Sequence, residues 1–258
     1  MNKIYTIRDA TQQQTHLWDN HRVEDEVAAC PKRNIVEYFL QYLPKDEPIL
    51  EAGCGLGAWV IYLSNKGYRI AGIDNNRDVI NRLKAWKPSL DVAYGDIRRL
   101  PYNDGHFGAC ISLGVVEHFE EGCEAAMKEA HRVLKPGGLL FLTVPLENVF
   151  RKAVAHPLRK IYLARHKQRG GKTHFAEYRY TTKEVELLVR NSGFEPLLTT
   201  WDDFTNKRMS LGIWADFPPL HSPRLYELNS VGSAAALMLN SLSRWTACGG
   251  VFCLAKKV

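Results

Sequence analysis

Short apolar stretches alternate with stretches of helical periodicity over much of the chain. The apolar stretches predict strands over 48–52, 69–73, 91–94, 107–113 and 139–144. The periodic stretches predict helices over 32–43, 58–66, 77–85 and 121–134. Alternating strands and helices are typical of an α/β fold, in which helices cover both faces of a parallel sheet.

After Pro145 the alternation breaks off, and it resumes with one more helix. Thr182 is the predicted N-cap of a helix over 183–191, and Gly193 is its predicted stop. Two further strands are predicted over 195–201 and 250–255.

Two segments, 146–178 and 203–248, are left over as insertions. A chain of 258 residues is long enough for one domain that carries such insertions. We therefore expect a single domain.

Composition adds little to this picture. The chain has 34 Lys and Arg against 28 Asp and Glu, a formal net charge of +6, which becomes informative only where it is concentrated. The six cysteines form no Cys-x-x-Cys pair. Residues 1–14 are polar and no run of about 18 apolar residues occurs, so we expect neither a targeting nor a membrane-spanning segment. A reduced, cytoplasmic protein fits best.

The first strand runs into the glycine-rich turn 51–57, Glu-Ala-Gly-Cys-Gly-Leu-Gly. Glycines there let the backbone approach a ligand closely. A dinucleotide site would place a pyrophosphate against the turn, where the Glu51 carboxylate would repel it. The spacing Gly-x-Gly-x-Gly also differs from the dinucleotide fingerprint. A ligand with a positive group fits this turn better.

Two more acids follow the next two strands. Asp74 comes about twenty residues after the turn, where a carboxylate can accept hydrogen bonds from both ribose hydroxyls. Asp96 could accept from an adenine amino group while Ile97 packs on the ring. Together with the turn, these residues describe a binding site for adenosine with a positive tail.

Several stretches carry a family resemblance in family order. They are 49–57, Gly72-Ile73-Asp74, Gly95-Asp96, Leu100-Pro101 with Phe107, Gly114 to His118, Leu134 to Gly138, and Tyr180-Thr181 leading into Gly193-Phe194. The chain resembles the class I S-adenosylmethionine (SAM) dependent methyltransferases of the small-molecule type that includes the ubiquinone biosynthesis enzymes. The resemblance implies a Rossmann-like, mostly parallel sheet of seven strands, the last antiparallel, with helices on both faces and the insertions as a cap.

The resemblance also assigns the cofactor contacts. It places Glu51 near the methionine amino group of SAM, Gly53 and Gly55 against the methionine part, Asp74 with Asn75 at the ribose, Asp96 with Ile97 at the adenine, and Leu113 in the pocket wall. For Glu51 and Asp74 the alternative is a loop cap or a surface acid, and for Asp96 a plain Asx turn. Residues 1–30, with Trp18, Asp19 and His21, are expected to form a lid over the cofactor, and the alternative is an aromatic simply packed on the domain.

Methyl transfer needs an aligned nucleophile and the exclusion of water, and a general base is optional. His118 could take the proton of a hydroxyl nucleophile, and the alternative is a loop histidine bonded to backbone. No metal-ligand spacing is recognisable in the sequence, so we expect no metal.

The first insertion is strongly basic. It contains Arg151, Lys152, Arg159, Lys160, Arg165, Lys167, Arg169 and Lys172, with no acid between Glu147 and Glu177. An amphipathic basic helix there could face an anionic substrate, an acidic membrane or nucleic acid, or be a solvated cover. The absence of a recognised nucleic-acid module makes nucleic acid the weaker option. Peripheral contact of a cytoplasmic protein with a membrane through 151–172 stays open.

The second insertion has aromatic residues and an apolar helix-like run over 225–245, which indicate a substrate cap, a membrane-facing surface or a buttress. The expected function is SAM-dependent methylation of a small or lipid-linked acceptor, at oxygen. One alternative is a non-catalytic SAM-binding protein that docks through the basic insertion. A nicotinamide-dependent oxidoreductase is disfavoured by Glu51 and the turn spacing.

Overall fold

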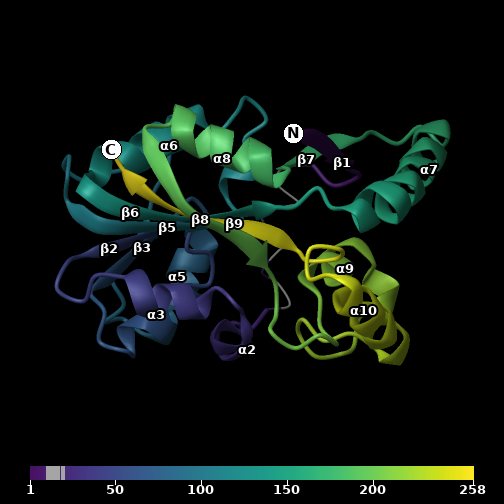
Figure 1. Ribbon diagram of the computed structural model, residues 1–258, viewed down its shortest axis with the longest axis horizontal. Helices are drawn as coiled ribbons and strands as arrows, with labels where there is room; N and C mark the ends of the chain where they lie inside the picture. Colours follow the sequence, from purple (N-terminus) through teal and green to yellow (C-terminus); the bar gives the residue numbers. More distant parts are fainter. Residues whose placement is uncertain (10–17, 19–20) are drawn as a thin grey trace.

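The computed structural model describes residues 1–9, 18 and 21–258 (Figure 1). Its strands are β1 Asn2–Thr6, β2 Ile49–Ala52, β3 Ile70–Asp74, β4 Val92–Tyr94, β5 Phe107–Leu113, β6 Leu134–Pro145, β7 His174–Arg179, β8 Phe194–Asp202 and β9 Gly250–Lys257. Its α-helices are α2 Val23–Ala29, α3 Val36–Tyr42, α4 Ala58–Ser64, α5 Arg77–Trp86, α6 Glu124–Val133, α7 His156–Gln168, α8 Thr182–Asn191, α9 Leu211–Asp216 and α10 Ser230–Leu242. Short helical turns are η1 Cys30–Lys32, η2 Val116–His118, η3 Arg151–Ala155 and η4 Pro218–Leu220.

Seven strands form the central sheet in the order β4-β3-β2-β5-β6-β9-β8. The pairs among β2 to β6 are parallel, and β9 is antiparallel to both β6 and β8. The α/β prediction is therefore confirmed, including the antiparallel last strand. The carboxyl ends of the parallel strands meet at one edge, which is where ligands bind in such sheets.

Helices cover both faces of this sheet, with α6 and α8 on one face and α3 and α5 on the other (Figure 1). On the first face Met127, Val133, Val185 and Val189 pack against the sheet residues Leu140 and Leu142. On the second face Phe39, Ile61 and Leu83 pack against Ile49 and Phe141. All six cysteines are buried and free.

Several element boundaries differ from those predicted. Strand β6 begins at Leu134, which pairs with Phe107, so it is longer than the expected 139–144. The prediction of Thr182 as N-cap was wrong, because Thr181 caps α8. The Thr181 hydroxyl accepts from the Glu184 backbone N–H, and the Glu184 carboxylate accepts from the Thr181 N–H.

The expected helix over 32–43 is shorter in the structure. The turn η1, with Pro31 in its first positions, precedes α3, which begins only at Val36. Proline suits the start of a helical turn because its missing N–H has no partner there anyway.

The first insertion adds a small second sheet. Strand β1 pairs antiparallel with β7, from Asn2 opposite Arg179 to Thr6 opposite His174, and the register shifts between Ile4 and Tyr5. Residues 2–6, expected as part of a lid, instead complete this sheet, while residues 10–17 and 19–20 lie outside the described residues. Helix α7 connects β6 to β7, and α7, α9 and α10 gather at one end of the molecule (Figure 1). Within the described part of the chain, no helix has both the length and the apolar character to cross a membrane.

Candidate functional site

The glycine-rich turn between β2 and α4 is held against β3. The backbone N–H groups of Gly53 and Cys54 both donate to the carbonyl of Ile73, at 2.8 and 3.0 Å. Gly53 has φ +85°, and a Cβ built there would lie 2.4 Å from a methyl group of Val115. Because a side chain fits neither the backbone angle nor the space, this position requires glycine.

Asp74, at the end of β3, connects the turn to the next helix. Its Oδ2 accepts from the Gly55 N–H at 2.8 Å and its Oδ1 accepts from the Asn76 N–H at 2.8 Å. Burial raises the pKa of Asp74, and these two N–H groups oppose the rise. Each carboxylate oxygen has further acceptor capacity for a ligand.

A small pocket lies beside this carboxylate, at the carboxyl edge of the sheet. It is lined by Gly53, Asp74, Asn75, Asp96, Ile97, Val115 and Phe119. Five of these were predicted as cofactor residues from the sequence. Val115 and Phe119 were missed, although Val115 lies within the stretch Gly114 to His118 that carries the resemblance and Phe119 directly follows it.

Asp96 is partly exposed, and Arg98 holds it. The Asp96 carboxylate accepts from the Arg98 backbone N–H at 2.8 Å and from its guanidinium at 2.7 Å. The Arg98 guanidinium lowers the pKa of Asp96, and it also lies 4.8 Å from the ring centre of Phe119. Arg98 therefore keeps Asp96 charged at the rim of the pocket.

The other three predicted cofactor residues lie outside the lining of this pocket. Glu51 is buried, and its Oε2 accepts from the Val60 N–H at 3.1 Å, in the first turn of α4. Burial raises the pKa of Glu51 well above its ordinary range. This contact is a cap, which was the alternative interpretation of Glu51 in the sequence. Leu113 ends β5 and packs against the second core cluster.

Gly55 contacts an aromatic ring from the N-terminal segment. A Cβ at Gly55 would lie 2.5 Å from the Trp18 ring, which therefore covers the turn. Arg82, on α5, donates to the carbonyls of Trp18 and His21, both at 3.1 Å. Trp18 thus packs on the turn and against the second core cluster, which agrees with both the lid and the packed aromatic, whereas Asp19 lies outside the described residues.

Glu117 and His118 follow β5 near the same edge. Glu117 is buried, its Oε2 has no hydrogen-bond partner among the described residues, and its Oε1 lies 3.9 Å from His118 Nε2. Burial raises the pKa of Glu117 to about 7. Sequence reasoning named only His118, since nothing in the sequence tells that the preceding acid points inward.

His118 is oriented by the basic insertion. Its Nδ1 lies 2.8 Å from the carbonyl of Ala176 in β7, so Nδ1 carries the hydrogen and Nε2 is left as the basic nitrogen. Loss of water around the ring lowers the pKa of His118, but the carboxylates of Glu117 and Glu177 outweigh this, and the net shift is upward.

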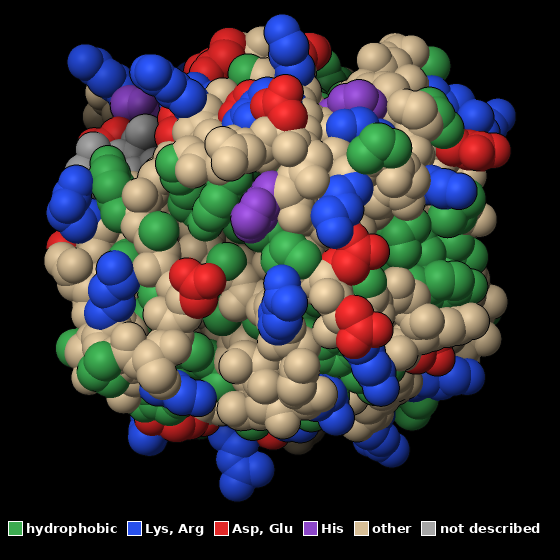
Figure 2. Space-filling model, turned by 90° about the vertical axis from the view of Figure 1, so that its left-hand side faces the viewer, with side chains coloured by type: hydrophobic (Ala, Val, Ile, Leu, Met, Phe, Trp, Pro, Cys, Tyr) green, Lys and Arg blue, Asp and Glu red, His purple; other side chains and the backbone are tan. Residues whose placement is uncertain are grey.

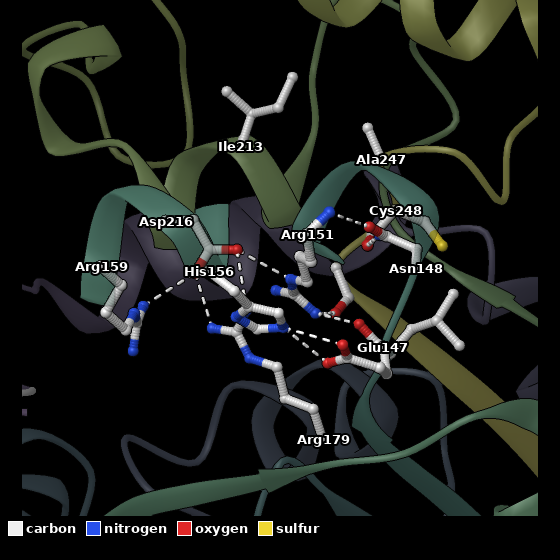
Figure 3. A network of polar contacts seen from close by, with 12 residues as sticks. Glu147, Asn148, Arg151, His156, Arg159, Arg179, Ile213, Asp216, Ala247 and Cys248 are labelled. Atoms are coloured by element: carbon white, nitrogen blue, oxygen red, sulfur yellow. Dashed lines mark hydrogen bonds and ion pairs between the residues drawn. The ribbon is translucent and has the colours of Figure 1, made fainter. Parts of the chain in front are cut away.

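A buried ionic network fastens both insertions to this edge (Figure 3). The Asp216 carboxylate, 1% exposed, pairs with Arg151 at 2.8 Å, Arg179 at 2.6 Å and Arg159 at 3.0 Å. Burial raises the pKa of Asp216, but Arg151 and Arg179 outweigh it and hold the pKa well below its ordinary value. Part of the positive charge of the first insertion is therefore internal rather than presented to a ligand.

Comparison with known proteins agrees with this geometry. Residues 50–142 match the model of a family described as a methyltransferase domain. A probable S-adenosylmethionine-dependent methyltransferase of Mycolicibacterium smegmatis is 28% identical over 110 residues, which are 43% of this chain and 42% of that protein. A tRNA (carboxymethyluridine(34)-5-O)-methyltransferase of Xenopus tropicalis is 30% identical over 142 residues, 51% of this chain and 22% of that protein. The chain therefore spans less than half the length of these relatives.

The fold is that of solved methyltransferases. The structure of a SAM-dependent methyltransferase from Methanosarcina mazei superposes with a TM-score of 0.58 at 20% identity, and the match covers 86% of this chain and 97% of that one. Residues 50–142 are a class I SAM-dependent methyltransferase domain, and SAM is the cofactor of that class. The narrower likeness to ubiquinone biosynthesis enzymes stays a prediction.

Proposed function

We propose that this chain transfers the methyl group of SAM to an oxygen atom of a small or lipid-linked acceptor. The observation that carries the proposal is the pocket at the carboxyl edge, where Gly53, Asp74, Asn75, Asp96 and Ile97 come together. Glycine backbone, an acid after the second strand and an acid after the third form a set suited to the methionine, ribose and adenine parts of SAM.

Within this proposal each residue has a defined task. Gly53 leaves room for the methionine part, Asp74 and Asn75 bind the ribose, and Asp96 with Ile97 binds the adenine. Glu51 supports the site from behind by holding α4 through the Val60 N–H. Leu113 remains a proposed wall residue at the end of β5.

Bound SAM supplies a methyl group already activated by its positive sulfur, so the protein has to align the acceptor and exclude water. His118 is the proposed base for the acceptor hydroxyl. Its Nδ1 donates to the Ala176 carbonyl, and Nε2 is then the atom that takes the proton. Glu117 stabilises the resulting cation from 3.9 Å.

The acceptor can be found by incubating the protein with a cell extract and SAM that carries a radiolabelled methyl group. The proposal expects label in lipids or other small molecules, and loss of that label with His118→Ala. Label in lipids or small molecules that His118→Ala leaves at the wild-type level would overturn the base role.

A tRNA acceptor is the second candidate, because the Xenopus relative is named for one and its methylated atom is an oxygen. Label confined to the RNA fraction would favour it over the small acceptor. SAM binding without label in any fraction would instead indicate the non-catalytic SAM-binding protein.

A further inference from the structure

Helix α7 presents an apolar stripe to solvent. No residue of α7 is buried, and Leu158, Ile161 and Tyr162 are 52%, 52% and 55% exposed. Val154, one turn earlier, is 38% exposed. Residues spaced by three, four and seven lie on one side of a helix. An amphipathic helix normally turns such a stripe toward the core, and α7 turns it away.

The opposite side of α7 is attached to the protein by polar contacts. Arg159 pairs with Asp216 at 3.0 Å, and His156 Nε2 lies 2.9 Å from the Glu147 carboxylate (Figure 3). Rolling the helix to bury Leu158 and Ile161 would break both contacts and leave the buried Asp216 with fewer partners. The outward direction of the stripe is therefore fixed by the fold.

The segment that carries the stripe is strongly positive. The exposed basic residues of the segment are Lys152, Lys160, Arg165, Lys167, Arg169 and Lys172. No acid occurs between Glu147 and Glu177, whereas the opposite end of the molecule carries acidic and basic side chains intermixed (Figure 2). An exposed apolar stripe on a segment whose charged residues are all Lys and Arg matches the interface of an anionic bilayer.

A second apolar surface lies at the same end of the molecule. Helix α10 contains no charged residue, and Val231, Met238 and Leu242 on it are 70%, 63% and 77% exposed. Helix α9 joins the two regions, because its Ile213 packs in one cluster with Ala236 of α10 and its Asp216 pairs with α7.

We propose that α7, together with α10 at the same end of the molecule, docks the protein on an anionic lipid bilayer. The aliphatic side chains Val154, Leu158 and Ile161 would enter the acyl boundary, and the exposed basic residues of the segment would meet the lipid headgroups. Nucleic acid is the weaker partner, since a phosphate backbone offers nothing to an aliphatic stripe. The inference goes beyond the proposed methyl acceptor and does not depend on its identity.

Flotation of the full chain with lipid vesicles tests this docking. The wild-type protein is expected to float with vesicles that contain phosphatidylserine, far less with phosphatidylcholine alone, and less as salt is raised. The double variant L158S/I161S is expected to bind roughly tenfold or more weakly, because two apolar side chains no longer enter the bilayer. Arg165→Glu is expected to bind roughly fivefold or more weakly.

The matched control is the double variant L40S/L187S. It replaces one exposed leucine on α3 and one on α8, both away from α7, and should bind like the wild type. Equal binding by L158S/I161S and the wild type would overturn the proposal, as would failure of the wild type to float. Salt-sensitive binding to tRNA with no vesicle binding would identify nucleic acid, and not lipid, as the partner. A wild-type dimer that L158S/I161S no longer forms would identify a second copy of the chain as the partner. SAM affinity, measured in parallel, reports separately on the cofactor site.

Discussion

At the scale of single residues, the pair Glu117 and His118 connects the protein's electrostatics to its proposed chemistry. A general base must be neutral before it takes a proton. The raised pKa of His118 means that the ring stays protonated to a higher pH than an ordinary histidine. The rate of methyl transfer to a hydroxyl acceptor should therefore rise with pH along an acidic limb.

Glu117→Gln is expected to move this acidic limb to lower pH. Removing a carboxylate 3.9 Å from Nε2 destabilises the charged ring and lowers the pKa of His118. The measurement is the pH profile of kcat/KM with the acceptor found in the extract. Glu124→Gln, an exposed acid at the start of α6, serves as control and should leave the limb in place. An unchanged limb in Glu117→Gln would contradict the pairing.

His118→Ala itself should lower kcat by about a hundredfold or more if the ring is the base. His131→Ala is the matched control, because His131 lies on α6 beside Phe194 and outside the pocket. Comparable activity in the two variants would show that His118 is not the base but a loop histidine bonded to backbone.

Much of the pocket could be predicted from the sequence, because Gly53, Asp74 and Asp96 each lie at or just after the end of a strand, and the strand ends meet at one edge. The direction of a side chain could not be predicted. Glu51 bonds to the Val60 N–H, which only the path of α4 brings within reach. Glu117 is buried because η2 turns it inward.

At the scale of helices and strands, the capping of α8 gives a direct test. Thr181→Ala should lower the free energy of unfolding by about 1 kcal/mol, because the Glu184 N–H loses its acceptor. Thr182→Ala, one residue further on and inside the helix, should cost less. Urea unfolding measures both, and a larger loss for Thr182→Ala would contradict the cap assignment.

The ionic network predicts a larger effect at Asp216. Asp216→Asn should cost about 3 kcal/mol or more, since Arg151 and Arg179 lose their shared carboxylate inside the protein. Because the pKa of Asp216 is lowered by folding, its stabilisation is complete above the ordinary aspartate pKa and is lost as the pH falls below it. The difference in the free energy of unfolding between the wild type and Asp216→Asn, measured by urea unfolding, should therefore become smaller in acid.

Asp78→Asn, an exposed acid in the first turn of α5, is the control for this change. If Asp216→Asn lowers the free energy of unfolding no more than Asp78→Asn does, the network contributes nothing measurable to stability.

The strands of the central sheet and the helices that cover it were predictable because each shows its own pattern of apolar residues in the sequence. The insertions were not, since their order depends on contacts between distant segments. Arg179 and Asp216 meet across 37 positions of sequence, and Asn2, near the N-terminus, pairs with Arg179. Exposed basic residues and buried ones such as Arg151 look the same in the sequence.

At the scale of the whole molecule, one edge of the sheet carries every feature with a proposed role. The pocket, His118 and the attachment points of both insertions all lie where the parallel strands end. Strand β7 of the first insertion orients His118 through the Ala176 carbonyl. Docking through α7 and the position of the base would thus depend on the same insertion.

The most direct test of the cofactor site is a calorimetric titration with SAM, repeated with NAD. The wild type should bind SAM and not NAD, Asp74→Ala should lose most of its SAM affinity, and Asp78→Ala should keep it. Unchanged SAM affinity in Asp74→Ala, or binding of NAD in place of SAM, would contradict the account.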